Sequence, residues 1–544
     1  MLTLRDHQSR ELFDPWEHLG AKRRRLLELS WAGVFREYLL VHLPVKELAV
    51  GFRDGHGRPS KDLSVALGAL ILQQLHDLTD QQATEAVALN IAWHYALDIR
   101  HESNACLCER TLRNYRTRLL EAGLDEVLFR TLTDKLIEKV AVDTRRQRLD
   151  STTVKSAIRG LTRLGILVEA TSKFLRELKR KNRSLYDNVD AEILRKYVER
   201  EGDGCFAVTR PSESKRRLPE AAQDVLALVE QFRDSEATKL EGYQLLQRIF
   251  HEQCEVVDDP DMPVVVRSPQ NSGCDNVINP ADPDARYNKH KGTGYLVQIM
   301  ETFVEDDAAS QNTSDAGQED TQPPKPDLIT HVAVDPLTMH DKDALEPALT
   351  DTEQRGQKPE ELLADSHYGS MECLAQGDEH GVKIISPAQT VPGKRQGKLT
   401  LENFELNDEG RILSCPTGQQ PLETSIADAR LQVLFDVAVC RECPHRENCS
   451  ASAASTRRSQ RFQYTHDRVR QRERRLKNDS DEFRNRYRWR AGVEATMSRF
   501  KYQMGMAHLR IRGMRSVTLT ALLRALGLNI CRVAVWRQAT ARTR

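Results

Sequence analysis

The sequence predicts an α/β protein whose mixed-sheet core follows an all-helical domain and is interrupted by two insertions. Apolar residues recur at helical spacing over residues 1–125 and again from 161 to about 255. From about residue 285, short apolar runs typical of strands alternate with a helix, which is an α/β pattern. A chain of 544 residues is also too long for one ordinary core, and its 39% apolar content is typical of a packed protein.

Residues 1–125 form the predicted helical domain, with a break at "HDLTDQQ" where Thr79 or Asp80 is the expected N-cap. A later helix, "CERTLRNYRTRLL", has one apolar face and one basic face. The basic face contains Arg110, Arg113 and Arg118. Two interpretations are open: a solvated basic surface, or the recognition helix of a helix-turn-helix unit that contacts DNA.

The predicted core begins within residues 126–160, where "RRQRLDSTTVKSA" is a short β-type run that contains Asp150. Residues 161–280 are helical and charged, and we interpret them as an inserted bundle or connector. The core resumes over residues 281–390. Its expected strands are 294–303, 327–336, 360–370 and 381–387, with one helix between the second and third; the third strand ends at Asp365.

Residues 391–455 are predicted to be a β-rich insertion with a hairpin around 407–410. Residues 456–544 contain a basic segment and a closing packing helix. From Thr456 to Arg515 there are 18 Lys and Arg against 6 Asp and Glu, whereas 304–327 is acidic and the whole chain has a net charge of zero. This uneven distribution favours a local site for a polyanion.

Several classes of protein are disfavoured by what the sequence lacks. The charged start does not resemble a signal peptide, and no apolar stretch is a credible membrane span. Eleven cysteines without a signal peptide indicate reduced thiols in a cytoplasm. No Walker-type phosphate loop is present, so no nucleotide cofactor is expected.

Three carboxylates carry the candidate chemistry: Asp150 and Asp365 on β-type runs and Glu494 on a helix. Carboxylates on apolar strands need a counter-charge, and Mg²⁺ prefers oxygen ligands. Three converging carboxylates could hold two Mg²⁺ (or Mn²⁺) ions for phosphodiester chemistry. Asp143 and Asp335 occupy similar settings, so position alone does not choose Asp150.

The stretch "YRWRAGVEATMSRFK" (487–501), which contains Glu494, indicates whether the candidate carboxylates belong to a functional site. If it is a continuous α-helix, Tyr487, Arg490, Glu494 and Lys501 lie within about 60° of one another. Such a polar stripe in the most basic segment favours a substrate-facing surface over a helix with stray ion pairs.

These residues resemble the signature of bacterial insertion-sequence transposases of the DDE type with a Tyr-Arg-Glu-Lys helix. "RLDSTTVKS" and "LLADSHYGS" resemble the two aspartate motifs of that family, and "GRPSKDLSVALGALILQQL" resembles its InsH-type N-terminal domain. The resemblance implies an RNase H-like core with a metal-binding triad of Asp150, Asp365 and Glu494. It also implies that Tyr487, Arg490 and Lys501 contact the DNA end. His367 departs from the family pattern, in which a small residue is expected.

By this resemblance the protein is a transposase that binds the terminal inverted repeats of its own element and catalyses cleavage and strand transfer. Its partners would be double-stranded DNA and a second copy of the chain in the synapse, in the bacterial cytoplasm at the nucleoid. The alternatives are a non-catalytic DNA-binding descendant, a metal-dependent nuclease without transfer activity, and a zinc-containing adaptor, which would leave the three carboxylates unexplained.

The cysteines form a second candidate metal site. Cys440, Cys443 and Cys449, with Cys415 upstream, could bind one structural Zn²⁺ through four thiolates. His445 is an alternative fourth ligand. A knuckle of reduced thiols without metal is the other interpretation.

Overall fold

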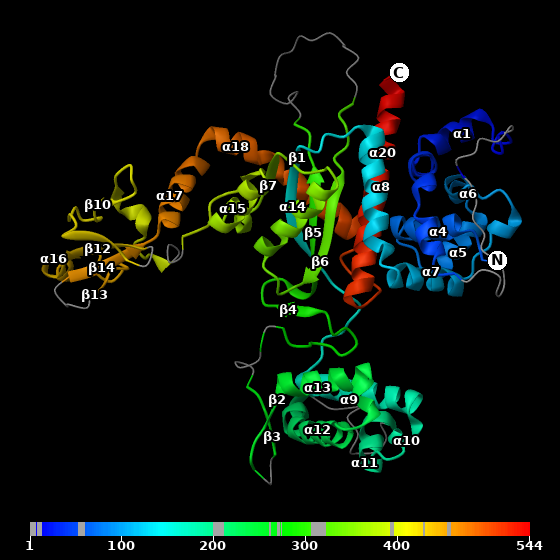
Figure 1. The fold of residues 1–544 in the computed structure, drawn as a ribbon, viewed down its shortest axis with the longest axis horizontal. Coiled ribbons are helices and arrows are strands. Elements are labelled where there is room, and N and C mark those ends of the chain that lie inside the picture. The colour runs from blue at the N-terminus through cyan, green and yellow to red at the C-terminus, as the bar shows by residue number, and fades with distance from the viewer. Residues whose placement is uncertain are drawn as a thin grey trace.

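The computed structural model describes residues 7, 14–52, 60–199, 211–259, 263–268, 273, 275–305, 323–391, 396–427, 430–453 and 459–543. Three outlying parts surround a central sheet: the N-terminal helices, a helical insertion and a small β domain (Figure 1). The predicted α/β class with a mixed sheet is confirmed. Of the acidic segment 304–327, only residues 304–305 and 323–327 are among the described residues.

The central sheet has the strand order β6-β5-β1-β7-β8, and β4 adds a short hairpin to β5. β1 runs antiparallel to β5 and parallel to β7, and β7 runs parallel to β8. The strands are β1 (Arg146–Val154), β4 (Arg286–Asn288), β5 (Gly292–Thr302), β6 (Ile329–Pro336), β7 (Glu361–Ala364) and β8 (Lys383–Ile385). All the predicted strands of the core are therefore present.

Helices cover both faces of this sheet. α8 (Leu124–Val140) and α20 (Met514–Thr543) pack on one face, in a core that includes Val297 and Ile299 of β5. α14 (Leu345–Gln354) and α15 (Met371–Glu379) bury apolar side chains with Leu149 and Met300 on the other.

α20 is the longest helix among the described residues, and it is the one described helix that is long and apolar enough to cross a membrane. In this structure 83% of that apolar stretch is buried inside the protein. It packs against α4, α8 and β6, so the prediction of a closing packing helix is confirmed.

The N-terminal domain is helical, as predicted, and it shares its hydrophobic core with α8 and α20. Its α-helices are α1 (Ala21–Glu28), α2 (Trp31–Val34), α3 (Val45–Ala49), α4 (Leu63–Leu75), α5 (Asp80–Leu89), α6 (Ile91–Leu97) and α7 (Glu109–Glu121). Thr79 is the N-cap of α5, where its side chain and that of Gln82 form a capping box. α7 buries Leu112, Tyr115 and Leu119, which confirms its predicted apolar face.

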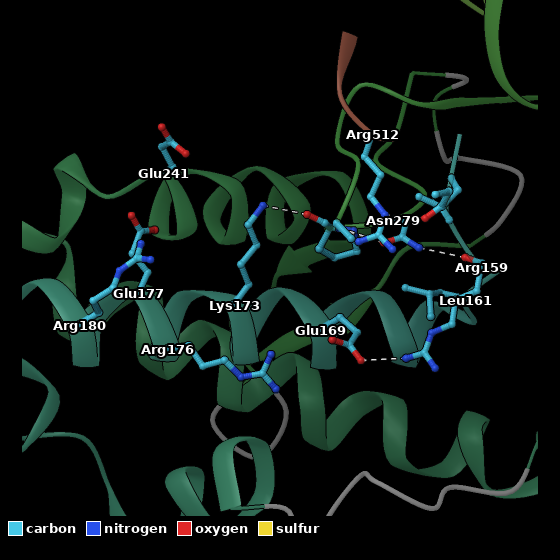
Figure 2. Close-up of a pocket in the computed structure, with 14 residues that line it drawn as sticks. Arg159, Leu161, Glu169, Lys173, Arg176, Glu177, Arg180, Glu241, Asn279 and Arg512 are labelled. Atoms are coloured by element: carbon cyan, nitrogen blue, oxygen red, sulfur yellow. Dashed lines mark hydrogen bonds and ion pairs between the residues drawn. The ribbon is translucent and has the colours of Figure 1, made fainter. Parts of the chain in front are cut away.

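The helical insertion has a hydrophobic core of its own. It consists of α9 (Arg163–Lys181), α10 (Arg183–Tyr186), α11 (Ala191–Leu194), α12 (Pro211–Phe232), α13 (Glu241–Gln253) and the hairpin of β2 (Cys254–Val256) and β3 (Val264–Val266). One side of α9 and the start of α13 border a pocket (Figure 2).

The small β domain contains the predicted hairpin, formed by β9 (Glu405–Leu406) and β10 (Ile412–Ser414) around a turn that ends at Gly410. Gly410 has φ +77°, a left-handed conformation that favours glycine. A second sheet contains β11 (Glu423–Ala427), β12 (Arg430–Asp436), β13 (Ser452–Ala453) and β14 (Ser459–Tyr464). Because β14 pairs with β12, the β structure continues past the predicted boundary at residue 455 to Tyr464.

Candidate active site

Two aspartates lie at adjacent positions of neighbouring parallel strands. Leu149 of β1 pairs with Ala364 of β7. The residues that follow them, Asp150 and Asp365, are therefore neighbours across the two strands. Neighbouring strands are about 4.8 Å apart, so this register brings the two carboxylates to one region of the sheet. β7 ends at Ala364, and Asp365 caps the following turn by accepting a hydrogen bond from the His367 amide at 2.8 Å.

The structure also separates Asp150 from the alternative Asp143. Asp143 precedes β1, is half exposed and forms an ion pair with Arg145 at 2.7 Å. Asp150 lies within β1, and its side chain is only 14% exposed. The two aspartates, which the sequence does not distinguish, therefore differ in burial and in position relative to the sheet.

The predicted continuous helix over 487–501 is wrong in detail. The chain passes through four short segments: α18 (Asp481–Tyr487), a 3₁₀ turn (Arg488–Ala491), α19 (Gly492–Ser498) and a π-helical turn (Arg499–Gln503). The uniform rotation of 100° per residue therefore does not hold, and one face does not have to contain all four polar residues.

Arg490 connects the first and third predicted carboxylates. Its Nη2 donates to Asp150 Oδ2 at 2.7 Å, and its Nη1 donates to Glu494 Oε1 at 3.0 Å. The Arg490–Glu494 contact is an ion pair within the helical segment, which the interpretation of the stripe as a substrate-facing surface did not include. The Glu494 carboxylate is still 66% exposed, whereas Arg490 is mostly buried.

Tyr487 belongs to the same group, whereas Lys501 has no described contact with it. Tyr487 stacks on Phe483 with ring centroids 5.4 Å apart and packs against a small core on β7 and β8. Burial raises the pKa of Tyr487 to about 12, and the charges of Asp365, Asp150 and Glu494 add to this rise. Burial alone lowers the pKa of Lys501.

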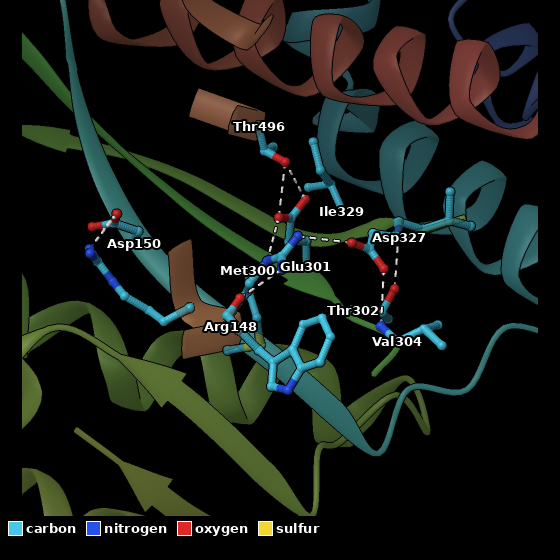
Figure 3. Close-up of polar contacts among 12 residues, drawn as sticks. Arg148, Asp150, Met300, Glu301, Thr302, Val304, Asp327, Ile329 and Thr496 are labelled. Carbon is cyan, nitrogen blue, oxygen red and sulfur yellow. Dashed lines mark hydrogen bonds and ion pairs between the residues drawn. The ribbon is translucent and has the colours of Figure 1, made fainter. Parts of the chain in front are cut away.

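A buried polar network fixes α19 to the sheet (Figure 3). The fully buried Glu301 of β5 accepts hydrogen bonds from Thr496 and ion pairs with Arg148 and Arg532 at 2.7 and 2.9 Å. Burial alone would raise the pKa of Glu301, but the two arginines hold it below its usual value. The network anchors the turn before Glu494, because Arg148 also donates to the Trp489 carbonyl at 2.9 Å.

Gly492 is required by the same network. A Cβ atom at this position would lie 2.1 Å from Nη1 of Arg148 and 2.5 Å from its Cζ. Glycine at the start of α19 therefore permits the buried arginine to reach the helix backbone.

The sequence interpretation missed a second polar group beside Asp150. Asp341 accepts hydrogen bonds from Ser151 Oγ at 2.8 Å and from Lys291 Nζ at 3.0 Å to each carboxylate oxygen. The Ser151 amide in turn donates to Asp150 Oδ1 at 2.8 Å. No spacing in the sequence signals this group, since Lys291 precedes β5 and Asp341 follows β6.

The electrostatics of Asp150 suit a cation site. Burial raises the pKa of Asp150 to about 6, Arg490 opposes the rise, and the charges of Asp365 and Asp341 increase it. Oxygen ligands whose negative charges repel one another are the donor set that a hard divalent cation stabilises. In the part of the chain that the structure describes, however, no three His, Cys, Asp or Glu side chains are grouped so that they could hold a metal ion.

The predicted DNA-binding arginines of the N-terminal domain lie on α7. Arg110 and Arg113 are exposed, in agreement with a basic surface. Arg118 is also exposed, but it has partners within its own domain: it donates to the Gly51 carbonyl and lies 4.2 Å from the centre of the Phe52 ring.

The four predicted zinc-binding cysteines line one small pocket of the β domain together with His445. They are Cys415, Cys440, Cys443 and Cys449. Two of the thiols have other partners: Cys415 Sγ lies 3.1 Å from Thr417 Oγ1, and Cys440 Sγ donates to Gln419 at 3.6 Å. All four are free cysteines.

Two parts of the chain match known families. Residues 35–118 match a family model described as "Transposase domain (DUF772)", and residues 414–534 match one described as "Transposase DDE domain". No curated protein and no solved structure matches the chain significantly. The two matches support an insertion-sequence transposase. The second match includes Arg490 and Glu494, and a DDE domain implies in general an enzyme that depends on a divalent metal.

Proposed function

We propose that the protein is a DDE transposase that binds the terminal inverted repeats of its own element and catalyses cleavage and strand transfer. The observation that carries the proposal is the meeting of three distant parts of the chain: Arg490 joins Asp150 to Glu494, and strand register brings Asp365 beside Asp150. The mixed sheet with one antiparallel internal strand supports an RNase H-like core.

Asp150, Asp365 and Glu494 would hold Mg²⁺ or Mn²⁺. Bound there, the metal would supply Lewis-acid activation of the attacking oxygen and of the leaving 3′-oxygen. The raised pKa of Asp150 supports this role, because a cation relieves the repulsion among the carboxylates.

Arg490 neutralises Asp150 and Glu494 and presents a planar cation to the substrate. Phosphate and carboxylate both accept two hydrogen bonds from a guanidinium, so a DNA phosphate can replace one carboxylate as the partner of Arg490. Tyr487 lies beside the carboxylates, and its hydroxyl stays protonated at neutral pH, as a donor to phosphate requires. Lys501 would contact the DNA backbone farther along the same segment.

The N-terminal helices would recognise the repeat, with Arg110 and Arg113 on the exposed face of α7. Two ends must be joined during transposition, so the active assembly would be a dimer on DNA in the bacterial cytoplasm, at the nucleoid.

The decisive experiment uses duplexes that carry the inverted repeats flanking the reading frame. The purified protein is incubated with labelled ends and a supercoiled target, in Mg²⁺ and in EDTA. The proposal requires metal-dependent cleavage at the repeat and joined products in the target. Cleavage without joining would indicate a nuclease, and binding without cleavage would indicate a non-catalytic descendant.

A structural zinc ion in the β domain completes the proposal. Four thiols and His445 around one pocket have the chemistry of a zinc site, although at least Cys415 and Cys440 would have to turn from their present partners. Metal analysis of the purified protein decides whether the β domain binds zinc. Cys440→Ser is the test variant and Cys373→Ser is the control. The proposal requires about one zinc per chain that is lost in the first variant alone.

A further inference from the structure

The pocket between the helical insertion and the core has basic residues from two distant parts of the chain, 159–180 and Arg512. It has a volume of about 900 Å³ and its lining includes Arg159, Lys173, Arg176, Arg180 and Arg512. Figure 2 shows these side chains along α9 and around the segment that contains Asn279. No part of the candidate active site described above includes them.

Three of these cations share one face of α9. Lys173, Arg176 and Arg180 are exposed, and their gaps of three and four residues place them within about 60° around the helix. They span about 10 Å along its axis, at about 1.5 Å per residue. Duplex DNA rises about 3.4 Å per nucleotide of each strand, so this spacing matches about three successive phosphates.

Two of the three carboxylates in the pocket, Glu169 and Glu177, have partners close by, whereas Glu241 has none among the described residues. Glu169 forms an ion pair with Arg159 at 3.0 Å, and Glu177 forms one with Lys181 at 2.6 Å and accepts from the Gly242 amide. Among the described residues, Arg176 and Arg180 have neither a hydrogen bond nor an ion pair, although Arg180 interacts electrostatically with Glu177. Their guanidinium groups can therefore bind an anion from outside the protein.

The pocket is connected directly to the catalytic strand. Beyond β1, residues 155–157 pair with residues 507–511, which follow the segment that contains Lys501. Ala157 and Arg512 at the end of this pairing both line the pocket. Seven residues at about 3.3 Å each place Ala157, at one edge of the pocket, no more than about 23 Å from Asp150. Arg176 and Arg180 lie farther from the site along the chain, within α9.

We propose that this pocket, with Arg176 and Arg180 as its principal contacts, binds the phosphate backbone of duplex DNA outside the scissile position. The inference rests on the proposed function for the position of the scissile bond. The backbone contact itself depends only on the geometry and charge of the pocket. Because no base-reading geometry is involved, the contact orients the duplex and does not select its sequence.

The first test measures binding of the full-length protein to a 30-bp duplex of arbitrary sequence in EDTA, as a function of salt. Arg176→Ala/Arg180→Ala should reduce the log–log salt slope by about two units. The matched control, Lys179→Ala/Arg183→Ala, removes the same charge from side chains that lie against the Tyr186 ring, and should leave the slope nearly unchanged. An equal slope for wild type and the first variant, or equal losses in both variants, would overturn the proposal.

A second test locates the contact. Neutral methylphosphonate linkages are placed one at a time along a cognate end, and binding is measured in EDTA. At the position that the pocket contacts, the linkage should weaken binding by the wild type but not further weaken binding by Arg176→Ala/Arg180→Ala. Additive losses at every position would overturn the proposal. Because both binding tests omit metal, a protein that binds in this way but never cleaves would contradict the proposed function alone.

Discussion

Nη2 of Arg490 lies 2.7 Å from Oδ2 of Asp150, although 340 positions separate the two residues in the chain. The contact joins the first strand of the sheet to the segment that contains Glu494. A guanidinium between two carboxylates offsets their repulsion until a phosphate or a cation takes its place. We infer that the site is assembled before DNA arrives.

Glu494→Gln should abolish cleavage and strand transfer and leave binding of DNA ends largely intact. The amide cannot supply a charged oxygen ligand, while the exposed position tolerates the change. Cleavage of labelled ends in Mg²⁺ and gel-shift titration measure the two properties. The control is Glu482→Gln, an exposed carboxylate on α18. Cleavage by Glu494→Gln at the wild-type rate would exclude this residue from the triad.

Asp150→Asn should stabilise the protein at neutral pH. The folded-state pKa of about 6 lies above the ordinary value of 3.8, so the ionised carboxylate costs stability. The cost is absent below about pH 4, grows as pH rises, and is complete above pH 6 at about 3 kcal/mol. Thermal unfolding should therefore show a higher Tm for the variant at pH 7.5 and no gain at pH 4.

The exposed Asp143→Asn is the control for this stability measurement. The pKa of Asp143 is lowered by its hydrogen bonds and ion pair with Arg145, so its ionised form is favoured in the folded state. This variant should gain nothing at pH 7.5. A Tm of Asp150→Asn that is lower than wild type at pH 7.5 would contradict the predicted cost.

Gly492→Ala should destabilise the protein by about 1–3 kcal/mol, because the added methyl group would overlap the buried Arg148 guanidinium. Displacing Arg148 also frees the Trp489 carbonyl, so cleavage should fall more than DNA binding does. Urea unfolding and cleavage rates measure both effects. At Gly20 no atom lies within 4 Å of an added Cβ, so Gly20→Ala is a suitable control.

Lys291→Met should shift the acid limb of the cleavage rate to higher pH. Without Lys291, the Asp341 carboxylate lacks its cation and raises the pKa of Asp150 further. Wild-type cleavage at limiting metal concentration should decline as pH falls, because protons compete with the metal for Asp150, whose pKa is raised by burial in the metal-free protein. Lys289→Met, which removes an exposed cation nearby, should leave the profile in place. Identical profiles for all three proteins would show that Lys291 does not act on Asp150.

Lys501→Ala should weaken end binding and reduce its log–log salt slope by about one unit. Lys501 is separate from the carboxylate group, so the rate of cleavage at saturating protein should change less than the affinity. Binding of labelled ends between 50 and 200 mM salt provides the measurement. An unchanged slope would remove Lys501 from the phosphate contacts.

Much of the fold follows from local patterns in the sequence. The apolar periods of α7 and α20, the N-cap at Thr79 and the strand that ends before Asp365 are all as predicted, since each depends on neighbouring residues. The segment 487–501 is helical throughout, as predicted, but its 3₁₀ and π-helical turns depart from a uniform α-helix.

The sequence by itself determined which side chains could do the chemistry: two strand carboxylates, a helical glutamate and the cations near it. Only the tertiary structure decided which of them meet. Strand register brings Asp365 beside Asp150, whereas Asp143 precedes β1 and pairs with Arg145. Arg490 contacts Asp150, and Lys501 has no described contact with these carboxylates. Lys291 and Asp341 join the site for the same reason: contacts between distant segments depend on packing, which no local spacing records.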